Sequence, residues 1–290
     1  MTRRRLLLEQ PLPAEVRALL APLERAHVEI AMRMNREPAK AVWTTLQRGA
    51  ATLWHGLALR RLLHVEGYHH VREAYARGAI LFVANHRTYY DLFVVSSLLH
   101  RTLPGRKRLY FPVTGQYYYQ SVGGMLLNQF FANWAMFPPL FALPTHRPSD
   151  QYALEVLAEL CAQGPGHILG IHPEGARNLD PDPYSFMRHK PGTGRIIHAA
   201  RPIVIPTFIA GLDNDMRRML RRNWRGGERV RLWFDAPMAL DEFLALPAKG
   251  STYVRITDAV MARVRALAEA DRAAFGTARP APVPPSPPPP

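Results

Sequence analysis

The chain has 290 residues, which is long enough to bury a full core as one large domain or two small ones. A hydrophobic fraction of 48% is ordinary for a globular protein, and it disfavours both a disordered chain and a polytopic membrane protein. The formal net charge of +14 predicts an anionic partner, which is nucleic acid, an acidic lipid surface or a phosphorylated small molecule.

The sequence carries no strong signal for export or for a membrane span. Only three leucines stand between Arg5 and Glu9, too few for a signal peptide, and no run of about 18 apolar residues occurs. The single cysteine, Cys161, cannot form an intrachain disulfide and is expected to be a small core residue. We therefore expect a protein of a reducing compartment.

Residues 1–63 are predicted to form an N-terminal helical region. The range 14–36 fits one charged helix that ends at Glu37–Pro38. The range 41–63 has basic ends and repeats apolar residues at helical spacing: Trp43, Leu46, Ala50, Leu53, Trp54 and Leu57. Such a helix either lies on an anionic bilayer surface or packs on the core of the domain.

A strand, a polar turn and a helix are predicted next. The apolar run 79–84 fits a strand buried on both faces. Thr88 and Asp91 have the spacing of the N-cap and N3 residues, so the following helix is predicted to begin near Tyr89. Backbone N–H groups at this helix start are candidate donors to an oxyanion.

His86 and Asp91 stand five positions apart at this turn. In a continuous helix they would point about 140° away from each other, so they meet only if His86 lies in a loop that folds back over the helix start. Asp91 would then hold one imidazole nitrogen and leave the other as a general base. The alternative is that Asp91 only caps the helix and His86 is a solvated loop residue.

Strands and helices alternate through the rest of the chain. Predicted strands cover 108–113, 167–171, 203–209 and 229–234, and predicted helices cover 149–163, 194–200 and 252–275. Three details are expected within them: an edge or strand-end position for Pro206, a helix cap at Ser149 or Asp150, and an inward face made of Val254, Met261, Val264 and Leu267.

This alternation predicts an α/β domain over residues 64–275, with a mostly parallel central sheet flanked by helices. A disordered proline-rich tail is expected at 276–290. The segment 116–143 is rich in aromatic residues, and it lines a tunnel for an aliphatic chain, contacts lipid headgroups or forms ordinary core. The turns after Ala84 and Ile171 both follow strands, so we expect them to face one crevice.

The second turn adds positive charge to that crevice. Glu174 and Gly175 belong to a Pro-Glu-Gly turn, and Arg177 can form a bidentate contact with a phosphate or carboxylate group. Arg147 and Lys190 are further candidate cations. A base held by a carboxylate, beside a basic pocket with apolar walls, fits acyl transfer to a hydroxyl of a phosphorylated acceptor.

Four segments carry a family resemblance over about residues 65–235. They are Asn85-His86-x-x-x-x-Asp91, Pro173-Glu174-Gly175-x-Arg177, Lys190-Pro191-Gly192 and Val204-Ile205-Pro206. In this order they resemble the glycerol-phosphate/lysophospholipid acyltransferase superfamily, of the 1-acylglycerol-3-phosphate O-acyltransferase type.

The resemblance implies a role for each motif. His86 deprotonates the acceptor hydroxyl, Asp91 orients its imidazole, and the hydroxyl attacks an acyl thioester of coenzyme A or a carrier protein without any other cofactor. The resemblance assigns acceptor and phosphate binding to a further set: Glu174, Gly175, Arg177, Arg147 and Lys190.

Three residues depart from the family pattern. His172, Ala176 and Asn178 stand where the family more often has Phe, Thr and Ser, which leaves the acceptor open between a glycerol phosphate, a lysolipid and an aminolipid precursor. Arg147 also lacks the glycine that usually precedes the family's second-block arginine.

The sequence also bears on two other functions, metal binding and non-enzymatic binding of nucleic acid or anionic lipid. No His-Glu-x-x-His or paired-cysteine spacing occurs, so no metal site is expected. The arginine run 217–225 is the main feature that favours a non-enzymatic protein binding nucleic acid or anionic lipid. We expect instead that this run docks the enzyme on anionic lipid or holds a thioester's nucleotide phosphates, with no nucleic acid bound and a peripheral location at the cytoplasmic face of a membrane.

Overall fold

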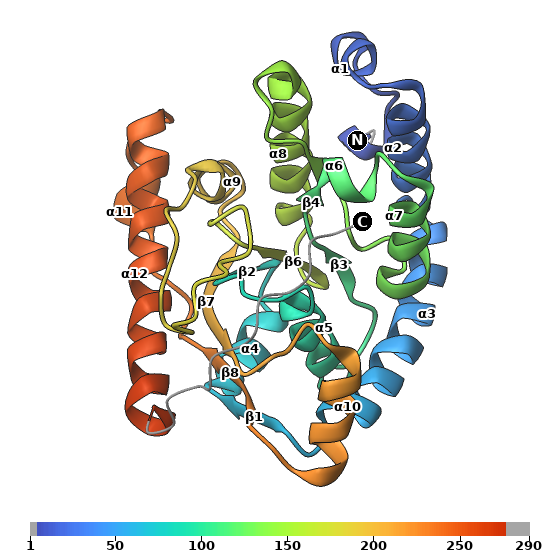
Figure 1. Ribbon diagram of the computed structural model, residues 1–290. Coiled ribbons are helices and arrows are strands. Elements are labelled where there is room, and N and C mark those ends of the chain that lie inside the picture. Colours follow the sequence, from blue (N-terminus) through green and yellow to red (C-terminus); the bar gives the residue numbers. More distant parts are fainter. Residues whose placement is uncertain (1–4, 277–290) are drawn as a thin grey trace.

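The computed structural model describes residues 5–276, and most of the predicted proline-rich tail lies outside them. A six-stranded sheet lies at the centre of the molecule, in the order β1-β8-β7-β2-β6-β3 (Figure 1). All neighbouring strands are parallel except β7 and β8. The mostly parallel α/β fold predicted from the sequence is therefore confirmed. The strands are β1 (Leu63–Glu66), β2 (Ile80–Ala84), β3 (Arg108–Tyr110), β6 (His167–Ile171), β7 (Ile203–Ala210) and β8 (Val230–Phe234), with a small separate pair, β4 (Val113–Thr114) and β5 (Pro139–Leu140).

Helices cover both faces of this sheet. The N-terminal part contains η1 (Leu7–Glu9), α1 (Ala14–Leu19), α2 (Pro22–Met34), α3 (Ala39–Trp54) and η2 (His55–Leu59). The middle contains α4 (Tyr68–Tyr75), α5 (Asp91–Thr102), α6 (Gly115–Tyr118), α7 (Val122–Leu127), η3 (Asn128–Ala132) and η4 (Pro144–His146). The last part contains α8 (Arg147–Cys161), α9 (Gly192–Ala200), α10 (Met216–Arg225), α11 (Asp241–Leu244) and α12 (Gly250–Phe275).

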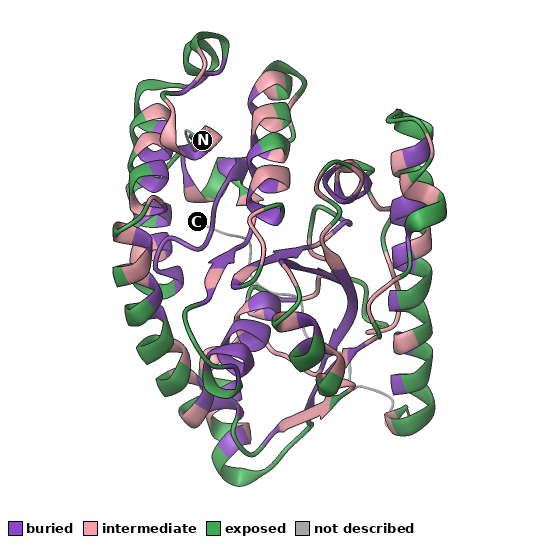
Figure 2. Cartoon of the chain, turned by 180° about the vertical axis from the view of Figure 1, so that it is seen from behind, coloured by how far each residue is buried: buried purple, intermediate pink, exposed green. Residues whose placement is uncertain are grey.

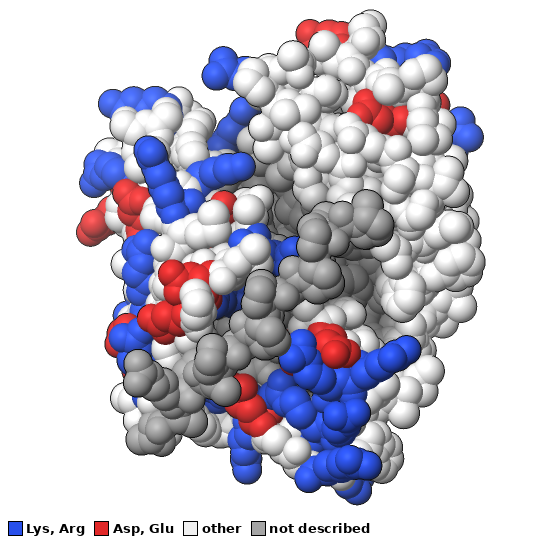
Figure 3. Space-filling view, viewed as in Figure 1, with Lys and Arg blue, Asp and Glu red and all other residues white. Residues whose placement is uncertain are grey.

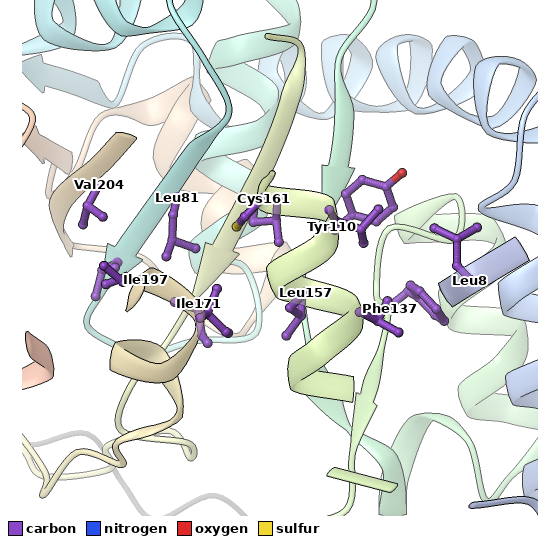
Figure 4. Close-up of a cluster of buried hydrophobic side chains, with 14 of the residues drawn as sticks. Leu8, Leu81, Tyr110, Phe137, Leu157, Cys161, Ile171, Ile197 and Val204 are labelled. Atoms are coloured by element: carbon purple, nitrogen blue, oxygen red, sulfur yellow. The ribbon is translucent and has the colours of Figure 1, made fainter. Parts of the chain in front are cut away.

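β2 is apolar at every position because both of its faces are covered (Figure 2). Leu81 and Val83 face the cluster under α8, α9 and α12, whereas Ile80 and Phe82 face the cluster under α4 and α5. The first cluster also takes in Leu8 of η1, so the N-terminal segment shares the core of the α/β domain (Figure 4).

Several predicted helix boundaries were wrong. The range 14–36 is two helices, because Pro22 cannot donate the backbone hydrogen bond of a helix interior and instead begins α2. The helix predicted at 41–63 ends earlier, and Leu63 already belongs to β1. β1, α4 and α10 were not predicted, and β1 is short and only half buried, so it has no clear apolar pattern.

Three local predictions also need correction. Pro206 lies neither on an edge strand nor at a strand end, but inside the central strand β7. Proline is tolerated at this position because the pairing of β7 with β8 starts only at the next residue, Thr207. Asp150 does not cap α8 but accepts hydrogen bonds from two backbone N–H groups of the preceding segment. Val254 is exposed on α12, while Met261 and Val264 point inward as expected.

α3 exposes its apolar side. The polar side chains Lys40, Thr44 and Gln47 are buried, and Lys40 donates to Asn35 Oδ1 and to the Leu109 carbonyl, both at 2.8 Å. The apolar stripe instead faces outward, at Val42, Leu46, Leu53 and, in η2, Leu57. Within residues 5–276, no helix combines the length and the hydropathy needed to cross a bilayer.

Candidate active site

The two polar turns lie side by side because the strands before them are neighbours. β2 and β6 are parallel and pair Val83 with Ile171, so the segments that follow the two strands leave the sheet at the same edge. The predicted common crevice is therefore confirmed. Asn85 holds this edge together, since its side chain accepts a hydrogen bond from the Ile209 N–H at 2.8 Å and donates to the Ile209 carbonyl at 2.9 Å.

His86 and Asp91 meet in the way that the loop geometry requires. His86 Nδ1 lies 2.9 Å from Asp91 Oδ2, and the carboxylate also accepts the backbone N–H groups of Arg87 (2.7 Å) and Thr88 (3.0 Å) and the Thr88 hydroxyl (2.6 Å). Burial opposes ionisation of Asp91, but these hydrogen bonds and the neighbouring imidazoles outweigh it, so the pKa of Asp91 lies below its usual value. An ionised Asp91 fixes the proton of His86 on Nδ1 and leaves Nε2 as the basic nitrogen.

The helix start differs from the prediction. α5 begins at Asp91 rather than near Tyr89, because the carboxylate closes the preceding loop instead of serving as an N3 cap residue. The N–H groups of Tyr89 and Tyr90 are also engaged, by Asn214 Oδ1 at 2.9 Å and Thr88 Oγ1 at 3.2 Å. The backbone donors at residues 87–90 are thus engaged within the protein, which disfavours them as donors to an oxyanion.

Glu174 lies behind the crevice rather than in its wall. Its two oxygens accept the N–H groups of His86 (3.0 Å) and Met187 (2.8 Å), and the side chain is buried. Burial raises the pKa of Glu174, and these hydrogen bonds partly offset the shift. Glu174 therefore joins the two polar turns. The sequence predicted a place for Glu174 at the acceptor and did not predict its hydrogen bonds to these backbone N–H groups.

A large cleft opens beside His86. Its volume is about 910 Å³, within the usual range for ligand sites. Three predicted cations line it together, Arg147, Arg177 and Lys190, and the lining contains a single carboxylate, Asp150, which is held by backbone N–H groups. The lining also contains apolar side chains: Leu92, Phe93, Phe111, Val113, Met136, Leu140 and Leu154.

Gly175 has a conformation that favours glycine. Its φ of +70° is left-handed, and a Cβ at this position would stand 3.0 Å from the Lys190 side chain. The guanidinium of Arg177 lies 3.8 Å from the centre of the Tyr89 ring, and its Nη2 donates to the Tyr89 hydroxyl at 2.8 Å. The turn thus holds Lys190 and Arg177 at the cleft.

The aromatic segment 116–143 divides among the roles considered for it. Tyr117 and Tyr118 line the cleft, Trp134 and Phe137 are core residues, and Phe130 is exposed. No single role describes the whole segment, because its short helices present different sides to the cleft, the core and solvent.

The three departures from the family pattern lie in different places. Ala176 lines the cleft. Asn178 faces away from it, since its Nδ2 donates to the carbonyl and the hydroxyl of Ser185, both at 3.0 Å. His172 lies against His86, with the two ring centres 4.0 Å apart and the two planes 5° apart.

His86, Asp91 and His172 form a group of potential metal ligands, with their donor atoms within 4.8 Å of one another. The geometry suits an ion poorly. The lone pairs of two stacked, parallel rings lie in two separate parallel planes, so they do not converge on one point about 2 Å from each nitrogen. Both Nδ1 atoms are also occupied, by Asp91 and by the Ala84 carbonyl.

Comparison with known proteins gives the family of the chain. A family profile described as Acyltransferase matches residues 62–210, and the chain therefore belongs to the acyltransferase family. The resemblance seen in the sequence is thereby confirmed. No curated protein matches the chain. Among solved structures, the crystal structure of the 1-acyl-sn-glycerophosphate (LPA) acyltransferase PlsC from Thermotoga maritima is similar, with 18% identity, a TM-score of 0.47, and coverage of 82% of this chain and 87% of that one.

Proposed function

We propose that this acyltransferase moves a fatty acyl group from a thioester to a hydroxyl of a glycerol-phosphate or lysolipid acceptor. The observation that carries the proposal is the position of the His86–Asp91 pair at a cleft that is lined by both cationic and apolar side chains. A fatty acyl chain suits the apolar side chains, and a phosphate group suits the cations.

The mechanism follows from the proton positions. His86 Nε2 removes the proton of the acceptor hydroxyl, the oxygen attacks the thioester carbonyl, and the imidazolium returns the proton to the departing thiolate. Asp91 holds Nδ1–H throughout and stabilises the imidazolium that forms. General base catalysis of this kind contributes about 10² to 10⁴-fold, and no covalent acyl-enzyme is needed.

Arg177, Lys190 and Arg147 bind the phosphate of the acceptor in this proposal. They come from two different segments, Arg147 from the start of α8 and the other two from the stretch between β6 and α9, and all three line the cleft. The thioester of coenzyme A or of a carrier protein is the co-substrate, and the chemistry requires no other cofactor.

We also propose that the enzyme works at an anionic membrane surface. The exposed side chains Val42, Leu46 and Leu53 lie on one side of α3, and the exposed side chains Val122 and Phe130 lie on one side of α7 and η3. In Figure 3 the side of the molecule over α7 and α3 carries few charged groups. Lys and Arg side chains are concentrated below this side, over α10. An apolar surface flanked by arginines suits a bilayer that contains acidic lipids.

The direct test is an acyl transfer assay with purified protein, a labelled acyl thioester and a panel of lysolipids and glycerol phosphates. We expect label in an O-acylated product, with phosphorylated acceptors preferred to acceptors that lack a phosphate. Transfer to water alone, or no transfer to any member of the panel, would contradict the proposed function.

A further inference from the structure

His172 is an active-site imidazole that the proposed mechanism leaves without a role. It lines the cleft, and its ring is stacked almost parallel on that of His86 at 4.0 Å. Its Nδ1 lies 3.1 Å from the carbonyl of Ala84, the last residue of β2. The stack arises because the strands that precede the two histidines are adjacent and parallel.

The contacts define the protonation of this ring. A carbonyl oxygen only accepts hydrogen bonds, so Nδ1 of His172 carries a proton. Burial, followed by the neighbouring charge of His86, lowers the pKa of His172 to about 3. The ring is therefore neutral near pH 7, and its π face lies against the imidazole that becomes cationic during the reaction.

The two contacts of His86 restrict different motions. The bond to Asp91 fixes Nδ1 but allows the ring to turn about the axis of that bond. A flat neighbour that is itself tied to the sheet restricts the plane of the ring, and thereby the direction of Nε2. A neutral aromatic face also attracts a cation that forms over it.

We propose that His172 is a positioning residue that fixes the ring plane of His86 and stabilises its imidazolium through the stacked contact. This inference rests on the proposed function, because it assigns His172 a task in the same reaction. His172 has two features that can be tested separately, its flat ring and its hydrogen bond to Ala84. A substitution can keep either feature while it removes the other.

Three substitutions make that separation. His172→Phe keeps the ring and loses the hydrogen bond, His172→Asn keeps a donor and loses the ring, and His172→Ala loses both. We expect kcat to fall about tenfold in the Ala and Asn variants at unchanged KM for the acceptor, and to return to within about threefold of wild type in the Phe variant. Wild-type kcat in His172→Ala, or a Phe variant no better than the Ala variant, would overturn the proposal.

A double variant tests whether His172 acts through the base. In a His86→Ala background, the further change His172→Ala is expected to leave the residual rate unaltered, because no ring remains to be positioned. An additional tenfold loss there would show an independent role and would contradict the inference.

The stack can also be observed without turnover. In protein with labelled histidine, the ring protons of His86 are expected to carry a ring-current shift in wild type and in His172→Phe that disappears in His172→Ala. Unchanged His86 signals in the Ala variant would overturn the proposal even if acyl transfer were seen. If wild-type protein transfers no acyl group, the proposed function fails, and these signals alone decide whether His172 positions His86.

Discussion

Asp91 shows how one side chain can organise a site. Its carboxylate collects the His86 imidazole, the N–H groups of Arg87 and Thr88, and the Thr88 hydroxyl. An unpaired buried carboxylate would be costly, whereas four donors keep Asp91 ionised and the loop closed. The orientation of the His86 ring and the formation of the loop therefore depend on the same atoms.

Arg177 gives a prediction about the acceptor. Replacing Arg177 by alanine removes a charge-assisted contact with the proposed phosphate, so we expect KM for a phosphorylated acceptor to rise about tenfold or more at similar kcat. The exposed Arg77 lies just before β2, at the opposite edge of the sheet, and Arg77→Ala is the matched control. Equal changes of KM in the two variants, or a fall in kcat alone in Arg177→Ala, would contradict a role of Arg177 in phosphate binding.

The sequence predicted part of this residue-level picture. The spacing of His86 and Asp91 required a loop that folds back, and the structure has that loop. The meeting of the two turns could be predicted, but the backbone partners of Glu174 and the stacking of His172 on His86 could not, because they depend on the directions of side chains across the turns. A histidine beside the Pro-Glu-Gly turn was the only signal of the stack.

At the scale of elements, α3 shows why a periodic pattern does not reveal which side is buried. Its apolar residues recur at helical spacing, yet the polar side chains Lys40, Thr44 and Gln47 face the interior, where Lys40 and Gln47 form hydrogen bonds. The sequence left a surface helix and a core helix open for this reason. The prediction for Pro206 failed because the sequence does not show where strand pairing begins. β7 is a central strand, but its pairing with β8 begins one residue after Pro206.

The buried lysine of α3 predicts a pH effect on stability. Burial lowers the pKa of Lys40 from 10.5 to about 7, so between these values the unfolded chain holds a proton that the folded chain has lost. Stability contributed by this group therefore rises with pH above about 7 and does not change with pH below that.

A comparison of denaturant midpoints at pH 7 and pH 9 checks this effect. We expect wild type to gain stability over this interval relative to Lys40→Met, which lacks the titrating group. Lys249 is exposed, and Lys249→Met is expected to follow wild type. An identical pH dependence in wild type and Lys40→Met would show that Lys40 keeps its ordinary pKa.

Gly170 of β6 gives a prediction about the acyl chain. A Cβ on Gly170 would stand 2.6 Å from Leu92 Cδ2 and 3.1 Å from Phe111 Cδ1, and both side chains line the cleft. Gly170→Ala is therefore expected to push them into the cleft and to shift the preference toward shorter acyl thioesters. Gly123 has open space around it, so Gly123→Ala serves as the control. A folded Gly170→Ala enzyme with the wild-type chain-length profile would show that the acyl chain lies elsewhere.

At the scale of the whole molecule, the net charge of +14 is unevenly distributed. α10 is joined to the end of η2, since Asn223 Nδ2 donates to the Leu57 carbonyl at 2.8 Å and Asn223 Oδ1 accepts the Arg61 N–H at 2.8 Å. α10, which carries the exposed arginines Arg217 and Arg221, therefore lies against η2, the helical segment that directly follows α3. Composition predicted an anionic partner, but only the fold shows where this basic helix lies.

Vesicle binding tests the membrane proposal. Sedimentation with vesicles that contain acidic lipid is expected to be strong at low salt and weaker at high salt, because exposed charges are screened within about 10 Å at 0.1 M salt. The pair Arg217→Ser and Arg221→Ser is expected to weaken binding and its salt dependence, and Arg77→Ser is expected to do neither. Preferential, steeply salt-dependent binding to DNA would favour the nucleic-acid alternative instead.

The proposed acyl transfer depends on His86 acting as the base. The most direct measurement is the rate of acyl transfer from a labelled thioester to a phosphorylated lysolipid by wild type and by purified His86→Ala of equal thermal stability. We predict that the rate falls by at least about 10²-fold in the variant, the lower end of general base catalysis. Turnover by His86→Ala close to the wild-type rate would contradict the account.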